Sequence, residues 1–147
     1  MNGSFSNIYK KARVNAGFKR EPVAEELHID VRTLDKYESV DNKPPDDIVR
    51  KMCVLYGNKY LAYEHLKKGV LGEFLPDVEK SNFQCSTLSM INDFNHFKDE
   101  LSKIIEIASD GKVNDWEKED WAKACKKIKS LAGSLMSVVL SDKGGNK

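Results

Sequence analysis

The stretch GFKREPVAEELHIDVRTLDKYESVDNKPP, residues 17–45, decides the fold of this chain. Its apolar residues recur at three- and four-residue steps, which predicts one helix over residues 20–27 and another over about 30–39. Pro22 falls in the first turn of the earlier helix, where a missing N–H costs little. Asp30 is expected to cap the later helix. Two short helices therefore meet across a turn of about three residues.

Three further helices are expected around this pair. One runs over residues 7–15, with Asn7 as its N-cap and Gly17 ending it in a left-handed conformation. The other two run over residues 46–56 and about 59–66. Five short helices make an all-α domain.

The three-residue turn has the spacing of a helix-turn-helix motif. The stretch resembles the lambda-repressor-like family of DNA-binding regulators, which includes the Cro and Xre types, and the resemblance covers residues 7–66. Six apolar residues stand at the family spacing: Val23, Ala24, Leu27, Ile29, Leu34 and Tyr37. Arg13 and Glu38 fall where the family often has an ion pair between the first helix and the end of the third. His28 replaces the usual turn glycine, and residues 39–42 replace the usual Asn-Gly, so that loop is expected to differ.

The resemblance implies that the third helix enters the major groove of duplex DNA. Base contacts are then expected from Val31, Arg32 and Lys36. Phosphate contacts are expected from Arg20, Lys19, Lys10 and Lys43. Asp35 counts against strong binding, because it places a negative charge near a polyanion. The carboxylate of Asp30 counts less, because capping is expected to occupy it.

The composition limits the kind of nucleic-acid binder this can be. The 147 residues include 24 Lys and Arg and 23 Asp and Glu, a net charge of +1, which excludes a generic polybasic binder. We expect a sequence-specific transcriptional regulator of phage or bacterial type, such as a repressor, bound to a double-stranded operator. The alternative is a protein-interaction module of the same fold that binds another regulator, which the near-zero net charge and Asp35 favour.

The second half of the chain predicts a different arrangement. After a domain over residues 1–68, residues 69–87 mix Gly, Pro and Ser with isolated apolar residues and are expected to be a linker. Residues 88–140 predict two long helices around the turn at 110–115, which form an antiparallel hairpin. Asp115 is expected to cap the second of these helices. The tail, residues 141–147, is expected to be disordered.

The apolar stripe on these two helices is wider than a two-helix hairpin can bury. We therefore expect a homodimer or higher homo-oligomer, joined through Phe94, Leu101, Ile105, Ile128, Leu135 and Val139. Packing against the chain's own first domain is the alternative. A dimer would hold two third helices about 34 Å apart, or a multiple of that, which suits successive major grooves.

Other kinds of site have little support. No phosphate-binding glycine loop, nucleophile elbow or zinc-protease motif occurs, so we expect no enzyme, no cofactor and no small-molecule ligand. Residues 110–117 match only the back half of a calcium loop, and the three histidines have no partner at ligand spacing, so no metal is expected. The odd, widely spaced cysteines, the lack of a signal peptide and the lack of an apolar run long enough for a membrane predict a cytoplasmic protein.

Overall fold

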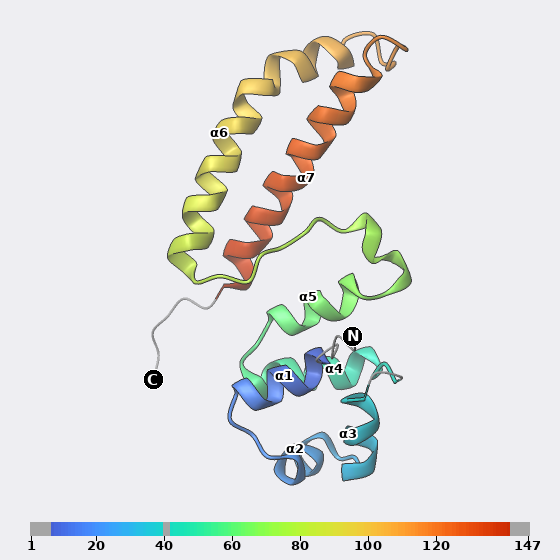
Figure 1. The fold of residues 1–147 in the computed structure, drawn as a ribbon, viewed down its shortest axis with the longest axis vertical. Coiled ribbons are helices and arrows are strands. Elements are labelled where there is room, and N and C mark those ends of the chain that lie inside the picture. Colours follow the sequence, from blue (N-terminus) through green and yellow to red (C-terminus); the bar gives the residue numbers. More distant parts are fainter. Residues whose placement is uncertain (1–6, 40–41, 142–147) are drawn as a thin grey trace, which may run out of the picture. The chain divides into compact units, whose positions relative to one another are not determined.

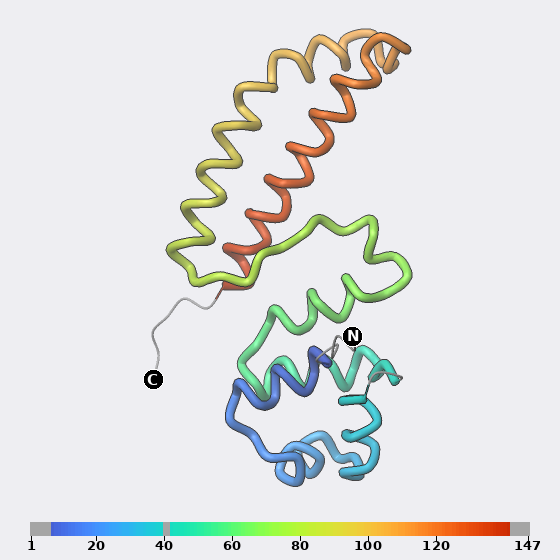
Figure 2. Tube along the Cα trace, in the orientation of Figure 1, coloured from blue at the N-terminus to red at the C-terminus, as the bar shows by residue number. Residues whose placement is uncertain are grey.

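A computed structural model gives the structure of residues 7–39 and 42–141. Over these residues the chain forms seven α-helices, one short 3-10 helix and no strand (Figures 1 and 2). The predicted all-α class is confirmed. The chain divides into two compact units, which we call unit 1 and unit 2, with the boundary after Glu73.

Unit 1 contains five short α-helices. They are α1 (Ile8–Asn15), α2 (Arg20–Leu27), α3 (Val31–Tyr37), α4 (Asp46–Tyr56) and α5 (Tyr60–Lys67), followed by a 3-10 helix (Val70–Phe74). The bounds of α2 and α4 are those predicted, and the others differ from the predictions by one or two residues. Asn7 caps α1 by accepting hydrogen bonds from the N–H groups of Tyr9 and Lys10, and Gly17 follows the helix with φ 78°. The loop expected to differ, at 39–42, includes Val40 and Asp41, which lie outside the described residues.

The core of unit 1 draws apolar side chains from all five helices. Val23, Leu34, Met52 and Leu61 are fully buried. Contacts join α1 to α4 and α5, α2 to α3 and α4, and α4 to α5. The two predicted motif helices therefore rest on a core that the other three helices complete.

A polar chain also crosses unit 1. The Tyr9 Oη lies 2.7 Å from His65 Nδ1, and His65 Nε2 lies 2.8 Å from Asp46 Oδ1. The Asp46 carboxylate can only accept from Nε2–H, so in the neutral imidazole Nδ1 is the acceptor for the Tyr9 hydroxyl. Burial, with a smaller contribution from the Asp46 charge, raises the pKa of Tyr9 to about 12. These two hydrogen bonds connect α1, α5 and the start of α4, and they give the buried His65 a partner on each ring nitrogen.

Unit 2 consists of two long helices that run antiparallel, side by side (Figure 1). They are α6 (Phe83–Ala108) and α7 (Lys118–Leu140). The expected linker, 69–87, is therefore shorter than predicted, because residues 70–74 form the 3-10 helix and α6 begins at residue 83. Of the tail predicted to be disordered, residues 142–147 lie outside the described residues.

The two helices of the hairpin meet along a mixed seam. Ser86, Ile107 and Ala124 are buried between them. Asp93 accepts a hydrogen bond from Ser130 of α7 at 3.2 Å, and Glu100 accepts one from Lys127. Polar side chains therefore make part of the contact between the helices. Several apolar residues of the predicted stripe consequently lie outside this contact and are exposed.

Candidate functional site

The pair α2–α3 forms a compact corner of unit 1. The turn between the helices is His28–Asp30, the predicted length, and the N–H of Ile29 donates to the carbonyl of Ala24 at 3.0 Å. His28 has φ 55° and ψ 46°, so it ends α2 in the left-handed region as expected for a residue in place of glycine. The turn sets α3 at an angle to α2 (Figure 2).

The six predicted motif-core residues lie at the contact between these helices and the core. Val23, Ala24, Leu27 and Leu34 are buried, and Ile29 and Tyr37 are partly buried against them. Ala24 is 2% exposed. A larger side chain there has no room, because α2 contacts both α3 and α4.

The outward face of α3 carries two of the three predicted base-contacting residues. Arg32 and Lys36, one turn apart, are exposed. Val31 is partly buried and packs against the core, so its methyl groups are only partly available to a partner. The exposed face of α3 is therefore less apolar than the sequence suggested.

The four predicted phosphate-contacting residues are exposed but do not all lie near α3. Lys19 is the residue before α2, and Lys10 lies in the first turn of α1. Arg20 Nε lies 3.3 Å from Asp35 Oδ1, in an ion pair between α2 and α3 in which both side chains are about half exposed. The ammonium of Lys43 lies beside Gly69, just after α5. The structure thus brings Arg20 to α3 and separates Lys43 from it.

The predicted side-chain cap on α3 is wrong. Asp30 occupies the N-cap position, but its carboxylate accepts no capping hydrogen bond. The N–H of Thr33, which would donate to such a cap, donates instead to the backbone carbonyl of Asp30 at 2.9 Å. An exposed carboxylate that caps nothing therefore stands two residues from Arg32.

The ion pair expected from the family resemblance is present and buried. Arg13 Nε and Nη2 donate to the two carboxylate oxygens of Glu38 at 2.6 and 2.8 Å, and Nη1 donates to the carbonyl of Phe18. The hydrogen bonds to Glu38 raise the pKa of Arg13 above its already high ordinary value. The pair fixes α1 to the residue that follows α3.

A second clamp at the same end of α3 was not predicted. The side-chain amide of Asn7 donates to the carbonyls of Tyr37 and Ser39, both at 2.9 Å, while its oxygen caps α1. Only Asn or Gln can donate and accept in this way, whereas the sequence pattern assigns Asn7 the capping role alone. The C-terminal end of α3 is thus held by two independent polar contacts, one from α1 and one from its cap.

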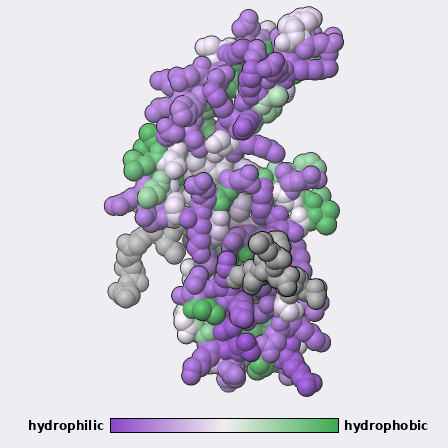
Figure 3. Space-filling view, viewed as in Figure 1, coloured by the Kyte–Doolittle hydropathy of each residue, from purple (hydrophilic) through white to green (hydrophobic). Residues whose placement is uncertain are grey.

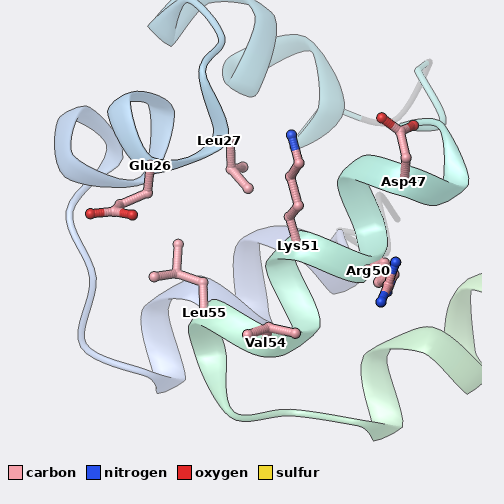
Figure 4. A pocket seen from close by; sticks show the side chains of 7 residues that line it. All are labelled: Glu26, Leu27, Asp47, Arg50, Lys51, Val54 and Leu55. Carbon is pink, nitrogen blue, oxygen red and sulfur yellow. The ribbon is translucent and has the colours of Figure 1, made fainter.

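A shallow groove lies beside α2, between it and α4 (Figure 4). It has a volume of about 410 Å³. Leu27 and Leu55 point toward one another across it, while Glu26 and Arg50 point away to either side. The charged groups that line the groove do not converge on one point.

Elsewhere in the described part of the chain, the candidate chemistry is sparse. No group of three or more His, Cys, Asp or Glu side chains in residues 7–39 and 42–141 is placed to hold a metal ion. No helix within these ranges combines the length and apolar character needed to cross a membrane. The three cysteines are free thiols. The six predicted oligomerisation residues lie on α6 and α7 and are between 38% and 67% exposed.

Comparison with known proteins adds no relative to this description. The chain matches no protein-family model, no curated protein and no solved structure.

Proposed function

We propose that unit 1 is a lambda-repressor-like helix-turn-helix domain that binds duplex DNA sequence-specifically, with α3 in the major groove. The observation that carries the proposal is the way α3 is held, with one side buried in the core and the opposite side exposed. One side is anchored by Leu34, which is fully buried, and the opposite side presents Arg32 and Lys36 to solvent. The clamps from Arg13 and Asn7 hold the far end of the helix. In helix-turn-helix proteins the start of the second motif helix contacts base edges in the major groove, and Arg32 stands at that place in α3.

Each cation has a role in this proposal. Arg32, at the start of α3, can donate two hydrogen bonds to guanine O6 and N7, and Lys36 reaches a further base or a phosphate. Lys19 and Lys10 contact phosphates. Arg20 pairs with Asp35 through Nε, and giving up that contact for a phosphate would cost little, because exposed ion pairs contribute about 0–1 kcal/mol.

The chain acts, on this proposal, as a transcriptional regulator of phage or bacterial type whose partner is an operator with paired half-sites. A single helix-turn-helix module contacts few bases, so two copies are needed to read such a site. The second copy is supplied by dimerisation through the C-terminal helices.

The test is the affinity of Arg32→Ala for an operator selected from genomic fragments by the full-length chain. Loss of a bidentate base contact should weaken binding by about 1–3 kcal/mol, roughly 5- to 150-fold, and relax one base position. Arg50→Ala is the matched control, since it removes the same charge from an exposed site on α4. Equal affinity of Arg32→Ala and wild type would contradict the assignment, and equal losses in both variants would show that only overall charge matters.

The runner-up function, a protein-binding module of the same fold, is favoured by the charge around α3. Residues 19–36 contain four basic residues, Lys19, Arg20, Arg32 and Lys36, and five acidic ones, Glu21, Glu25, Glu26, Asp30 and Asp35. Binding to random DNA discriminates the two functions. A DNA-binding domain should bind at low salt and lose affinity steeply as salt rises, because phosphate contacts release counterions. A chain that binds no DNA even at low salt would favour the protein-binding role.

A further inference from the structure

The two flanks of the α6–α7 hairpin differ in chemistry. One flank, which we call the polar flank, carries Ser89, Asn92, His96 and Lys103 from α6 and Glu119, Lys123, Lys126 and Ser130 from α7. Here Lys103 bonds Asp120 across the helices at 2.8 Å. In Figure 3 the flank in view is mostly hydrophilic.

The chain's own connector covers part of the polar flank. It runs across the end of α7 before entering α6 (Figure 1). The carbonyl of Glu79 accepts a hydrogen bond from Ser137 at 2.7 Å, and the carbonyl of Asp77 lies against Gly133, which is buried. Residues 75–82 thus cover the polar flank near Gly133 and Ser137, and exposed polar side chains make up the rest of it.

The opposite flank, which we call the apolar flank, has no such cover among the described residues of unit 2. Helical spacing places seven exposed apolar residues on it: Ile91, Phe94, Leu101 and Ile105 of α6, and Ile128, Leu135 and Val139 of α7. The two rows lie on the same side of the hairpin because the helices are antiparallel. Lys98 is the charged residue that the α6 row contains.

The exposed area is large for a monomer. The seven side chains are 38–67% exposed. At about 150–200 Å² for each large apolar side chain, they present on the order of 600 Å². That is the upper end of the patch that monomers expose, and most of the roughly 800 Å² per partner that a standard interface buries.

The exposed apolar residues of α6 and those of α7 also lie at matching positions along the length of the hairpin. Asp93 bonds Ser130, so the neighbouring Phe94 and Ile128 lie level near the middle of the hairpin. By the same spacing, Leu101 lies level with Trp121, and Val139 with the start of α6 near Phe83. At these levels both helices present an apolar residue, whereas Lys118 stands beside Ile105.

We propose that the apolar flank binds the same flank of a second copy, with the two-fold axis parallel to the helices. This operation places α6 against the partner's α7, so every neighbouring pair in the resulting four-helix bundle is antiparallel. Phe94 then faces Ile128 of the partner subunit, and Ile128 faces the partner's Phe94. The two hairpins enter the bundle from the same end, so the chain leading back to each unit 1 leaves from that end. The proposal concerns the hairpin alone and stands whether or not unit 1 binds DNA.

The first test is the association of the full-length chain, by light scattering and sedimentation at tens of micromolar. Wild type should be a dimer. Phe94→Lys and Ile128→Glu should each weaken the dimer by about tenfold or more, since each would bury a charge among apolar groups. Asn92→Lys, which places a charge on the polar flank, should leave the dimer intact. A monomeric wild type, or a Phe94→Lys variant that dimerises as tightly as wild type, would overturn the proposal.

Mixing the two weakened variants tests the pairing itself. In a mixed dimer, one contact joins the introduced lysine to the introduced glutamate, and the other keeps the native Phe and Ile. Equal amounts of the two variants should therefore restore dimers. An axis perpendicular to the helices would pair Phe94 with the partner's Phe94, and mixing would then restore nothing. Restoration also shows that each variant is folded, because an unfolded chain has no flank to contribute.

Discussion

At the scale of single residues, the buried Arg13–Glu38 pair gives the clearest prediction about stability. Both side chains are less than 10% exposed, and the carboxylate accepts two hydrogen bonds from the guanidinium. In Glu38→Gln, one of those oxygens becomes an NH2 group, which faces a donor and leaves Arg13 charged and unneutralised. Breaking a buried pair on one side typically costs about 3–5 kcal/mol. We expect a loss of about 3 kcal/mol in the free energy of unfolding, measured by urea denaturation.

The matched control for that substitution is Glu25→Gln. Glu25 is exposed on α2, and its neutralisation should change stability by no more than about 0.5 kcal/mol. Equal stability of the two variants would mean that the buried pair contributes nothing net. The double change Arg13→Met with Glu38→Leu should recover part of the loss, since it removes both buried charges together.

Single residues also show where sequence reasoning stops. The Arg13–Glu38 pair was predicted, because the family resemblance supplied a contact between residues 25 apart. The cap by Asp30 was predicted and is absent, because a tight first turn gives the Thr33 N–H a backbone acceptor instead. The Arg20–Asp35 pair and the two donations by Asn7 were missed. They depend on the distance between helices, which no local pattern encodes.

At the scale of helices, the bounds were predictable where conformationally special residues mark them. Pro45 precedes α4, and Gly57 ends it with φ 62°. The predicted start of α6, residue 88, is late, because the first inward residue is Ser86 and a search for apolar periodicity passes over a buried serine. The expected N-cap Asp115 is likewise wrong. The N–H of Asn114 donates to the Glu117 carboxylate in a turn of its own, and α7 begins only at Lys118.

At one helical glycine, replacement by alanine should lower stability, contrary to what helix propensity predicts. In an ordinary helix interior, Gly→Ala stabilises by about 1 kcal/mol. At Gly133, however, a Cβ would stand 2.0 Å from the carbonyl oxygen of Asp77, which is backbone and cannot step aside cheaply. Gly133→Ala should therefore lower the free energy of unfolding by about 1–3 kcal/mol, because overpacking forces the connector off α7.

Thermal unfolding monitored by circular dichroism checks this sign. Lys129→Ala, at an exposed site on the same helix, is the control and should be close to neutral. A Gly133→Ala variant that is as stable as wild type, or more stable, would show that the connector is not seated on α7.

At the scale of the whole molecule, the chain consists of two compact units, and on the proposals above unit 1 binds DNA while unit 2 joins two copies. Each buried residue of the apolar core cluster in unit 1 lies between Ile8 and Leu61, so unit 1 has a core of its own. The hairpin has a separate seam of paired polar and apolar groups. The sequence predicts that the first domain ends at residue 68, whereas the compact unit extends to Glu73. Gly72 packs against the carbonyl of Lys67, which is a close backbone contact that composition alone does not reveal.

This division makes a prediction about a truncated chain. Residues 1–73 should unfold cooperatively as a helical monomer, because they retain the complete core of unit 1. If the hairpin pairs two copies on one operator, the truncation should bind that operator about 10²- to 10⁴-fold more weakly than the full chain, since the second half-site is no longer tethered. At concentrations where it is monomeric, full-length Phe94→Lys should bind as weakly as the truncation, although it keeps every residue of unit 2 but one. A truncation that stays dimeric would place the interface in unit 1. A monomeric Phe94→Lys that binds as tightly as wild type would separate DNA binding from dimerisation and favour a single module acting alone.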